Sequence, residues 1–218
     1  MYLPELENYL SEMGEPRFRA KQIFHWLQSG VTDFDEMTDI SKALRERLKA
    51  DAYIASAETE RRYASRLDET VKYVFRLFDG ELIETVLMKY EHGYTVCIST
   101  QVGCRMGCKF CASGINGLTR SLTASEMLAQ ITAVQRDNNI RVSNIVMMGM
   151  GEPLDNFDNS VRFLKLVSDE NGLNIGLRHI SLSTSGVVSG IKKLKEYNLP
   201  ITLSISLHAP SDDIRSSV

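Results

Sequence analysis

Four cysteines, Cys97, Cys104, Cys108 and Cys111, are the residues whose spacing most directly predicts chemistry. The last three form the pattern C-x-x-x-C-x-x-C in a glycine-containing stretch. Thiolates are the usual ligands of iron–sulfur clusters, and one compact loop can bind a cluster through three of them. Since a [4Fe–4S] cluster has four irons, three cysteines leave one iron open to the amine and carboxylate of a substrate or cofactor. The pattern therefore predicts a [4Fe–4S] cluster bound by Cys104, Cys108 and Cys111.

Two other interpretations of the cysteines stay open: a structural zinc loop, and a buried set of cysteines without metal. Zinc sites usually pair two C-x-x-C units or use histidine, and no histidine lies between residues 93 and 178. A secreted disulfide scaffold would distribute its cysteines along the chain, whereas all four here lie within residues 97–111. Metal or redox chemistry inside the cell is therefore favoured.

The composition of the 218 residues excludes several classes of protein. The chain is 43% hydrophobic and 24% charged, which allows a buried core and argues against disorder. It contains no apolar run of the roughly 18 residues that a membrane span needs, and its start lacks the features of a signal peptide. We therefore expect a cytoplasmic protein with no membrane association.

The charge of the chain gives no strong indication of its partners. The formal net charge is −3, which neither indicates nor excludes nucleic acid. Basic residues gather locally at 17–21, 61–66 and 192–195. Such clusters are usually solvated faces, and their functional interpretation is phosphate contact.

Two patterns of periodicity divide the chain near residue 90. Before it, helical spacing predicts short helices at 3–13, 18–28 and 42–49, and alternation predicts a hairpin of strands 71–77 and 82–88. We expect residues 1–90 to form a mainly helical accessory domain with a β-hairpin. Residues 91–218 form the second predicted domain.

The second predicted domain alternates strands with helices. The sequence predicts strands at 94–100, 144–148, 179–183 and 201–207, with helices at 123–136, 159–167 and 188–197. This order is typical of right-handed βαβ units around a parallel sheet, with ligands at the carboxyl ends of the strands. The fold class is therefore α/β, a partial (βα) barrel. Four strands do not close a barrel, so we expect a chain truncated at its C-terminus.

Three candidate residues stay ambiguous when judged by residue type alone. Glu152, in a loop after the second strand, could face an ammonium group or stabilise a helix start. Cys97 could be a small buried hydrophobe on its strand. Glu84 could be an ordinary exposed carboxylate.

The order of the motifs resembles a known family. The segments Cys97–Cys104, Met148–Leu154, Leu182–Gly186 and Ser206–Pro210 surround or follow the cysteine loop in sequence. Together they resemble the RlmN/Cfr family of radical S-adenosylmethionine (SAM) RNA adenine methyltransferases, and most closely its RlmN branch. The resemblance extends over essentially the whole chain and includes Phe18–Phe24 and Trp26 near the N-terminus.

This resemblance implies the cofactors and the roles of individual residues. The cofactors are a [4Fe–4S] cluster and SAM, on a radical SAM barrel. Glu84 is implied to be a proton acceptor, and Cys97 to resolve a covalent RNA–protein adduct by forming a transient disulfide. The implied SAM contacts are Gly151, Glu152, Ser183, Ser206, Leu207 and His208.

The implied activity is methylation of carbon 2 of an adenine in 23S ribosomal RNA, at the peptidyl transferase centre, and in the anticodon loop of transfer RNA. The methyl group passes through a methylated cysteine, in a ping-pong mechanism. No cysteine follows Cys111, so we expect a fragment that lacks this carrier and is inactive in methyl transfer. A flavodoxin-like electron donor and a monomeric state are further expectations. The alternatives are a Cfr-type enzyme acting on carbon 8 and a non-catalytic iron–sulfur or zinc module.

Overall fold

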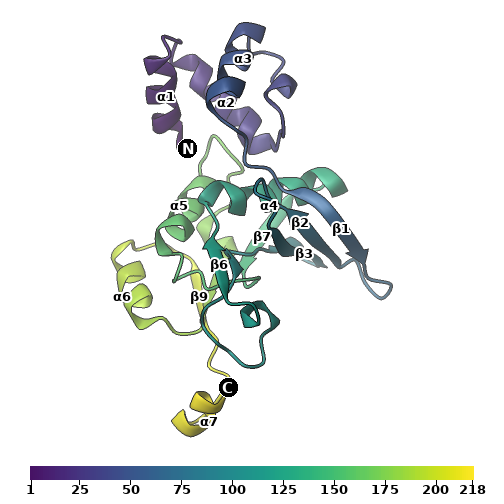
Figure 1. Ribbon diagram of the computed structural model, residues 1–218, viewed down its shortest axis with the longest axis vertical. Coiled ribbons are helices and arrows are strands. Elements are labelled where there is room, and N and C mark those ends of the chain that lie inside the picture. Colours follow the sequence, from purple (N-terminus) through teal and green to yellow (C-terminus); the bar gives the residue numbers. More distant parts are fainter.

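The computed structural model describes residues 1–218, which begin with a group of short helices set apart from the sheet (Figure 1). These helices are α1 (Leu3–Glu12), α2 (Phe18–Ser29), the 3-10 turn η1 (Phe34–Glu36) and α3 (Lys42–Asp51). Isolated helices of this length are marginal in water, so each is stabilised by packing against the others. The buried residues Leu10, Phe24 and Leu48 supply that contact.

A mixed seven-stranded sheet forms the centre of the molecule, in the order β1-β2-β3-β4-β7-β8-β9. The first four strands pair antiparallel, and β4, β7, β8 and β9 pair parallel, as the alternation of strands and helices predicted. The strands are β1 (Glu58–Ala64), β2 (Val71–Arg76), β3 (Leu82–Tyr90), β4 (Gly93–Cys97), β7 (Val142–Met147), β8 (Ile180–Thr184) and β9 (Thr202–Ile205).

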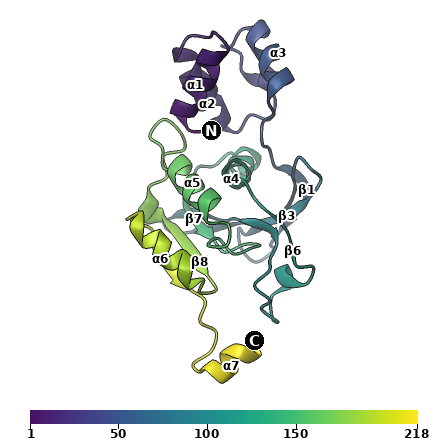
Figure 2. The ribbon, with the colours of Figure 1, turned by 60° about the vertical axis from the view of Figure 1, so that its left-hand side comes forward.

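Helices cover one face of this sheet. Figure 2 shows α4 and α5 between the sheet and the N-terminal helices. The strand side chains on the covered face, among them Tyr73, Phe75 and Ile83, are fully buried. The connecting helices are α4 (Ala124–Asn138), α5 (Phe157–Val167) and α6 (Val188–Glu196), with the turn η3 (Leu177–His179) before β8 and the short α7 (Asp212–Ser217) at the end.

A second, two-stranded sheet brackets the cysteine loop. It pairs β5 (Gln101–Gly103) antiparallel with β6 (Leu118–Ser121), and the turn η2 (Ala112–Gly114) lies between them. The sequence did not predict this sheet, because strands of three and four residues show no measurable alternation. Its effect is to close the loop that contains Cys104, Cys108 and Cys111.

Three other details differ from the sequence predictions. The strand predicted at 94–100 ends at Cys97, and β1 was not predicted because all seven of its residues are exposed and show no apolar alternation. The division predicted at residue 90 falls in the turn between β3 and β4, so the sheet is continuous across it. The separate helical part ends at Asp51. None of the helices is long and apolar enough to cross a membrane.

Candidate active site

A cavity of about 560 Å³ lies at the carboxyl ends of β7, β8 and β9. The side chains of Cys104, Cys108 and Cys111 line it on one side, and loops that follow the parallel strands line it on the other. This is the edge where parallel α/β sheets bind ligands, because the loops there are free to vary while the strands hold them in place. The cavity is therefore the candidate active site.

The loop that carries the three cysteines is held at its base. The Cys104 N–H donates to the Gly117 carbonyl oxygen over 3.0 Å, and the Cys111 N–H donates to the Cys108 carbonyl oxygen over 3.0 Å. Gly103 has a φ of +75°, and a methyl group on it would overlap the Gly117 carbonyl oxygen. Glycine is therefore required at the point where the chain leaves β5 and enters the loop.

The chemistry of the three thiols fits an iron–sulfur cluster. All four cysteines of the chain are free and half-buried. Burial raises the pKa of the Cys104 thiol, and the negative charges of Cys111 and Cys108 raise it further. A cationic group between the three sulfurs would remove that repulsion. No three Cys, His, Asp or Glu side chains converge on a single metal-ion position, but each cysteine of a [4Fe–4S] cluster binds a different iron.

Glu152 connects two of the loops that line the cavity. Its carboxylate is almost fully buried and accepts hydrogen bonds from the Leu154 N–H (3.0 Å) and the Ser185 N–H (2.7 Å). The Glu152 N–H in turn donates to the Gln101 Oε1 atom over 2.9 Å. The carboxylate thus fixes the loop after β7 against the loop after β8, a role that residue type alone did not indicate. It also lines the cavity, where it can meet a ligand ammonium group.

Three further predicted contact residues meet on the same side of the cavity. The Ser183 and Ser206 hydroxyl oxygens are 3.2 Å apart and both residues line it, as does His208. His208 has a φ of +56°, and its ring lies 4.6 Å from the ring of Phe110, in the cysteine loop. These side chains therefore join the cysteine loop to the ends of β8 and β9.

The structure brings together five of the six predicted SAM contacts. Gly151 lines the cavity with Glu152, Ser183, Ser206 and His208, whereas Leu207 is absent from the lining and is 64% exposed. A methyl group on Gly151 would lie 2.5 Å from the Gln101 Cβ atom, so this loop packs directly on the chain after β4. Leu207 can reach a ligand in the cavity only through its main chain.

Glu84 and Cys97 lie outside the lining of the cavity, on the open face of the sheet. Val86 on β3 is directly opposite Cys97 on β4, so Glu84 and Cys97 are diagonal neighbours on one face, roughly 7–8 Å apart. Burial raises the pKa of the Cys97 thiol, although a hydrogen bond from the Met148 main chain acts in the opposite direction. The Glu84 carboxylate is 2.6 Å from the Lys72 ammonium nitrogen.

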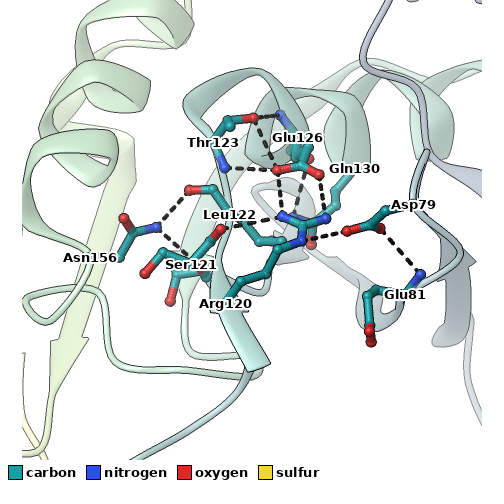
Figure 3. A network of polar contacts seen from close by, with 10 residues as sticks. Asp79, Glu81, Arg120, Ser121, Leu122, Thr123, Glu126, Gln130 and Asn156 are labelled. Carbon is teal, nitrogen blue, oxygen red and sulfur yellow. Dashed lines mark hydrogen bonds and ion pairs between the residues drawn. The ribbon is translucent and has the colours of Figure 1, made fainter. Parts of the chain in front are cut away.

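A network of polar contacts surrounds Arg120 near the start of α4 (Figure 3). Arg120 on β6 donates to both carboxylate oxygens of Glu126 and, through Nε, to Asp79 in the β2–β3 turn over 2.6 Å. These carboxylates raise the pKa of the Arg120 guanidinium well above its usual range. Asn156 donates to the main-chain oxygens of Thr100 and Leu122. The network thereby joins the hairpin, the small sheet and α4.

Sequence reasoning missed Ser99 and Gln130, two buried polar residues close to the main chain of Glu84. The Ser99 hydroxyl donates to the Glu84 carbonyl oxygen over 2.6 Å and accepts from the Met150 N–H over 3.0 Å. Gln130 on α4 accepts from the Ser99 N–H and donates to the Ser99 carbonyl oxygen. One feature of the sequence could have indicated Gln130. It follows Glu126 by one helical turn, on a face of α4 whose other residues are mostly apolar.

Comparison with known proteins agrees with this geometry. Residues 98–218 match the radical SAM superfamily, and residues 1–54 match the ribosomal RNA large subunit methyltransferase N-terminal domain. Proteins named "Probable dual-specificity RNA methyltransferase RlmN" are 56% identical over 98% of the chain in Alkaliphilus oremlandii and 51% identical over 99% in Clostridium novyi. The chain spans 62% and 63% of the length of these two relatives.

A solved structure shows the same fold. The crystal structure of a radical SAM methyltransferase from Sphaerobacter thermophilus superposes with a TM-score of 0.94 at 46% identity, covering all of this chain and 65% of the other. The predicted α/β radical SAM fold with a helical N-terminus is thereby confirmed. The cysteine loop, the parallel strands and these matches all lead to the same conclusion: the chain belongs to the radical SAM superfamily.

Proposed function

We propose that this protein is an RlmN-type RNA methyltransferase, acting on carbon 2 of an adenine in 23S ribosomal RNA and in transfer RNA. The observation that carries the proposal is the single cavity shared by Cys104, Cys108, Cys111 and the strand-end loops. Members of the superfamily use a [4Fe–4S] cluster and SAM, and the donor set of the cavity suits both. The relatives, which are longer than this chain, are named as dual-specificity RNA methyltransferases.

The residues that would hold the two cofactors follow from the lining of the cavity. Cys104, Cys108 and Cys111 would bind the cluster, and Glu152 with Ser183 and its neighbours would hold SAM. When bound, these cofactors supply the radical chemistry that activates a methyl group toward a carbon that is not nucleophilic. The loops after β7 and β8, fixed to each other by the Glu152 carboxylate, keep a SAM molecule in one orientation at the mouth of the sheet.

Glu84 and Cys97 would act on the RNA on the open face of the sheet. The Glu84 carboxylate would accept the proton that carbon 2 of the adenine loses once the carrier's methylene group is bonded to it, and the unpaired electron of that adduct would pass to the cluster. The Cys97 thiolate would then attack the sulfur of the carrier cysteine. The carbon–sulfur bond breaks, its electron pair takes up a proton at the methyl carbon, and the two sulfurs form a disulfide. The four cysteines of these 218 residues do not include the carrier cysteine. The resemblance to the family implies this residue and its thioether.

The proposal is tested with the whole protein, reconstituted anaerobically with iron, sulfide and SAM and supplied with 23S ribosomal RNA and transfer RNA. Mass spectrometry of the digested RNA should detect 2-methyladenosine. Cys97→Ala should retain SAM cleavage and leave the protein covalently attached to RNA, because adduct formation precedes the step that needs Cys97. Detection of 8-methyladenosine would favour a Cfr-type enzyme. An absence of SAM cleavage would contradict radical chemistry altogether.

A further inference from the structure

We propose that Lys72 is the positioning residue of Glu84, holding its carboxylate aimed at the substrate. The inference rests on the proposed function, in which Glu84 is the proton acceptor. Lys72 lies on β2, and its Nζ atom is 2.6 Å from the Glu84 Oε1 atom. No motif pointed to Lys72, because it is one polar residue in an alternating strand.

The strand register places this ion pair beside Cys97. Lys72 is opposite Val86, and Val86 is opposite Cys97, so these three residues form one row across β2, β3 and β4. Opposed residues of antiparallel strands project to the same face of the sheet. Glu84 is therefore a diagonal neighbour of both Lys72 and Cys97, and the ammonium group approaches the carboxylate from the side away from Cys97.

The main chain of Glu84 is fixed independently of Lys72. Its carbonyl oxygen accepts from the Ser99 hydroxyl over 2.6 Å. Gln130 in turn fixes Ser99, because its side chain accepts from the Ser99 N–H and donates to the Ser99 carbonyl oxygen. The adjacent residue, Thr85, donates its hydroxyl to Gln130 over 2.8 Å. Since the backbone is anchored, the freedom left to Glu84 lies in its side-chain torsions, and the contact with Lys72 restricts these.

An ammonium group suits this purpose chemically. It donates to one carboxylate oxygen and leaves the other oxygen free to accept a proton, so the contact fixes the direction of the carboxylate. The other titratable groups that face Glu84 are Cys97 on β4, Arg61 on β1, which is opposite Val74, and the Arg76–Glu60 pair. Arg76 is neutralised by Glu60, so Lys72 is the cation in direct contact with the Glu84 carboxylate.

Because the Lys72–Glu84 ion pair is partly exposed, a role in positioning Glu84 can be distinguished from a role in stabilising the fold. The Lys72 and Glu84 side chains are 44% and 47% exposed, and ion pairs at such exposure contribute little to stability. Loss of Lys72 should therefore leave the fold intact and affect the proton-transfer step. The same hairpin contains a matched control, Lys89, which is also 44% exposed and pairs with Glu69 over 2.5 Å.

The experiment compares Lys72→Met, Lys72→Arg and the control Lys89→Met in the whole, anaerobically reconstituted protein. Single-turnover samples are assayed for 5′-deoxyadenosine, covalent RNA adduct and methylated RNA. Lys72→Met should form 5′-deoxyadenosine normally, accumulate adduct and slow methylated product by about tenfold or more, because the base loses its fixed orientation. Lys72→Arg should recover most of the rate, and Lys89→Met should match the wild type.

Three outcomes would overturn the inference, and they are distinguishable. An unchanged product rate in Lys72→Met would show that Lys72 does not act on Glu84. A weaker RNA affinity with a smaller salt dependence, and a normal product rate at saturating RNA, would make Lys72 a phosphate contact instead. Normal product from Glu84→Gln would remove Glu84 from the proposed mechanism, and this inference with it. An inactive Glu84→Gln beside an unaffected Lys72→Met would contradict the inference alone.

Discussion

Glu152 is an acidic residue that lies buried between the loops after β7 and β8. Its buried carboxylate accepts from two main-chain N–H groups, of Leu154 and Ser185. In Glu152→Gln one oxygen is replaced by an NH₂ group that would face a main-chain N–H, leaving a buried donor without an acceptor. We expect a loss of about 1–3 kcal/mol in the free energy of unfolding, together with weaker SAM binding. Urea denaturation measures the first and equilibrium binding of SAM the second.

A matched variant separates burial from charge in that experiment. Glu170→Gln removes the same charge from an exposed turn and should leave the free energy of unfolding within about 0.5 kcal/mol of the wild type. Equal stability of the two variants would show that the Glu152 carboxylate does not connect the loops.

Cys97 should titrate at higher pH than an ordinary thiol. Burial raises its pKa, and the protonated thiol is the poor nucleophile, so alkylation by iodoacetamide should be slow at neutral pH and rise only at high pH. The measurement uses a variant with Cys104, Cys108 and Cys111 replaced by Ser, which leaves Cys97 as the single thiol among these 218 residues. A midpoint at or below that of a free cysteine peptide would contradict burial as the dominant effect.

Residue types and spacing identified the residues of the cavity better than the residues that support them. The three cysteines and five of the six other predicted contacts do line one cavity, because the motifs follow successive strand ends. Ser99 and Gln130 could not be found in this way. Their importance depends on the burial of their polar atoms and on partners 15 and 31 residues away in sequence.

Helix α4 supports the site through a single buried amide. Gln130 is fully buried, and its side chain satisfies the N–H and carbonyl of Ser99 and the hydroxyl of Thr85. Gln130→Met keeps the size of the side chain but leaves these polar groups unpaired, which should cost about 3 kcal/mol in urea denaturation. Gln22→Met, at an exposed hydrogen bond to Asp39 on the N-terminal helices, is the control and should cost less than about 1 kcal/mol. Similar losses in both variants would contradict a special role for Gln130.

At the level of elements, periodicity predicted the interior of the molecule and missed the edge strand β1. The predicted helices 159–167 and 188–197 correspond to α5 and α6, and the four predicted parallel strands to β4, β7, β8 and β9. All of these except the edge strand β9 contain buried residues, so their hydrophobic pattern is constrained. β1 is an exposed edge strand whose main chain pairs with β2 alone, and such pairing does not constrain side-chain type.

The N-terminal helices join the rest of the molecule through a tight contact on α4. Gly30 ends α2 with a φ of +87°, and a methyl group there would lie 2.7 Å from the Thr132 Cβ atom. Its carbonyl oxygen accepts from Arg136 over 3.0 Å. Beside this contact lies a second cavity of about 290 Å³, lined mostly by apolar residues of both parts. The helices also contact the rest of the molecule through the Glu5–Arg162 ion pair and through Gln28, which accepts from the Leu173 N–H.

Gly30→Ala should loosen this contact. Strain at positive φ and overlap with Thr132 together should lower the free energy of unfolding by about 2–4 kcal/mol, and hydrogen exchange should show the loss across residues 1–51. Gly14→Ala is the control, since Gly14 has a φ of +76° but no atom within 4 Å of the added methyl group. It should cost about 1 kcal/mol. Equal costs would show that packing on Thr132 does not matter.

The arrangement of the whole molecule was less predictable than its parts. A change of periodicity near residue 90 was visible in the sequence, yet β3 and β4 pair across it in one sheet. Pairing between strands on either side of a turn depends on register, which a single sequence does not reveal when one face of the sheet is open.

The central claim is that Cys104, Cys108 and Cys111 bind a [4Fe–4S] cluster with one iron open to SAM. The measurement that tests it most directly is electron paramagnetic resonance of the reduced, anaerobically reconstituted protein, with and without SAM, alongside iron and sulfide analysis. The account predicts one [4Fe–4S] cluster per chain, a spectrum that changes when SAM is added, and loss of the cluster in Cys108→Ala but not in Cys97→Ala. Stoichiometric zinc without iron, or a cluster spectrum that SAM leaves unchanged, would contradict it.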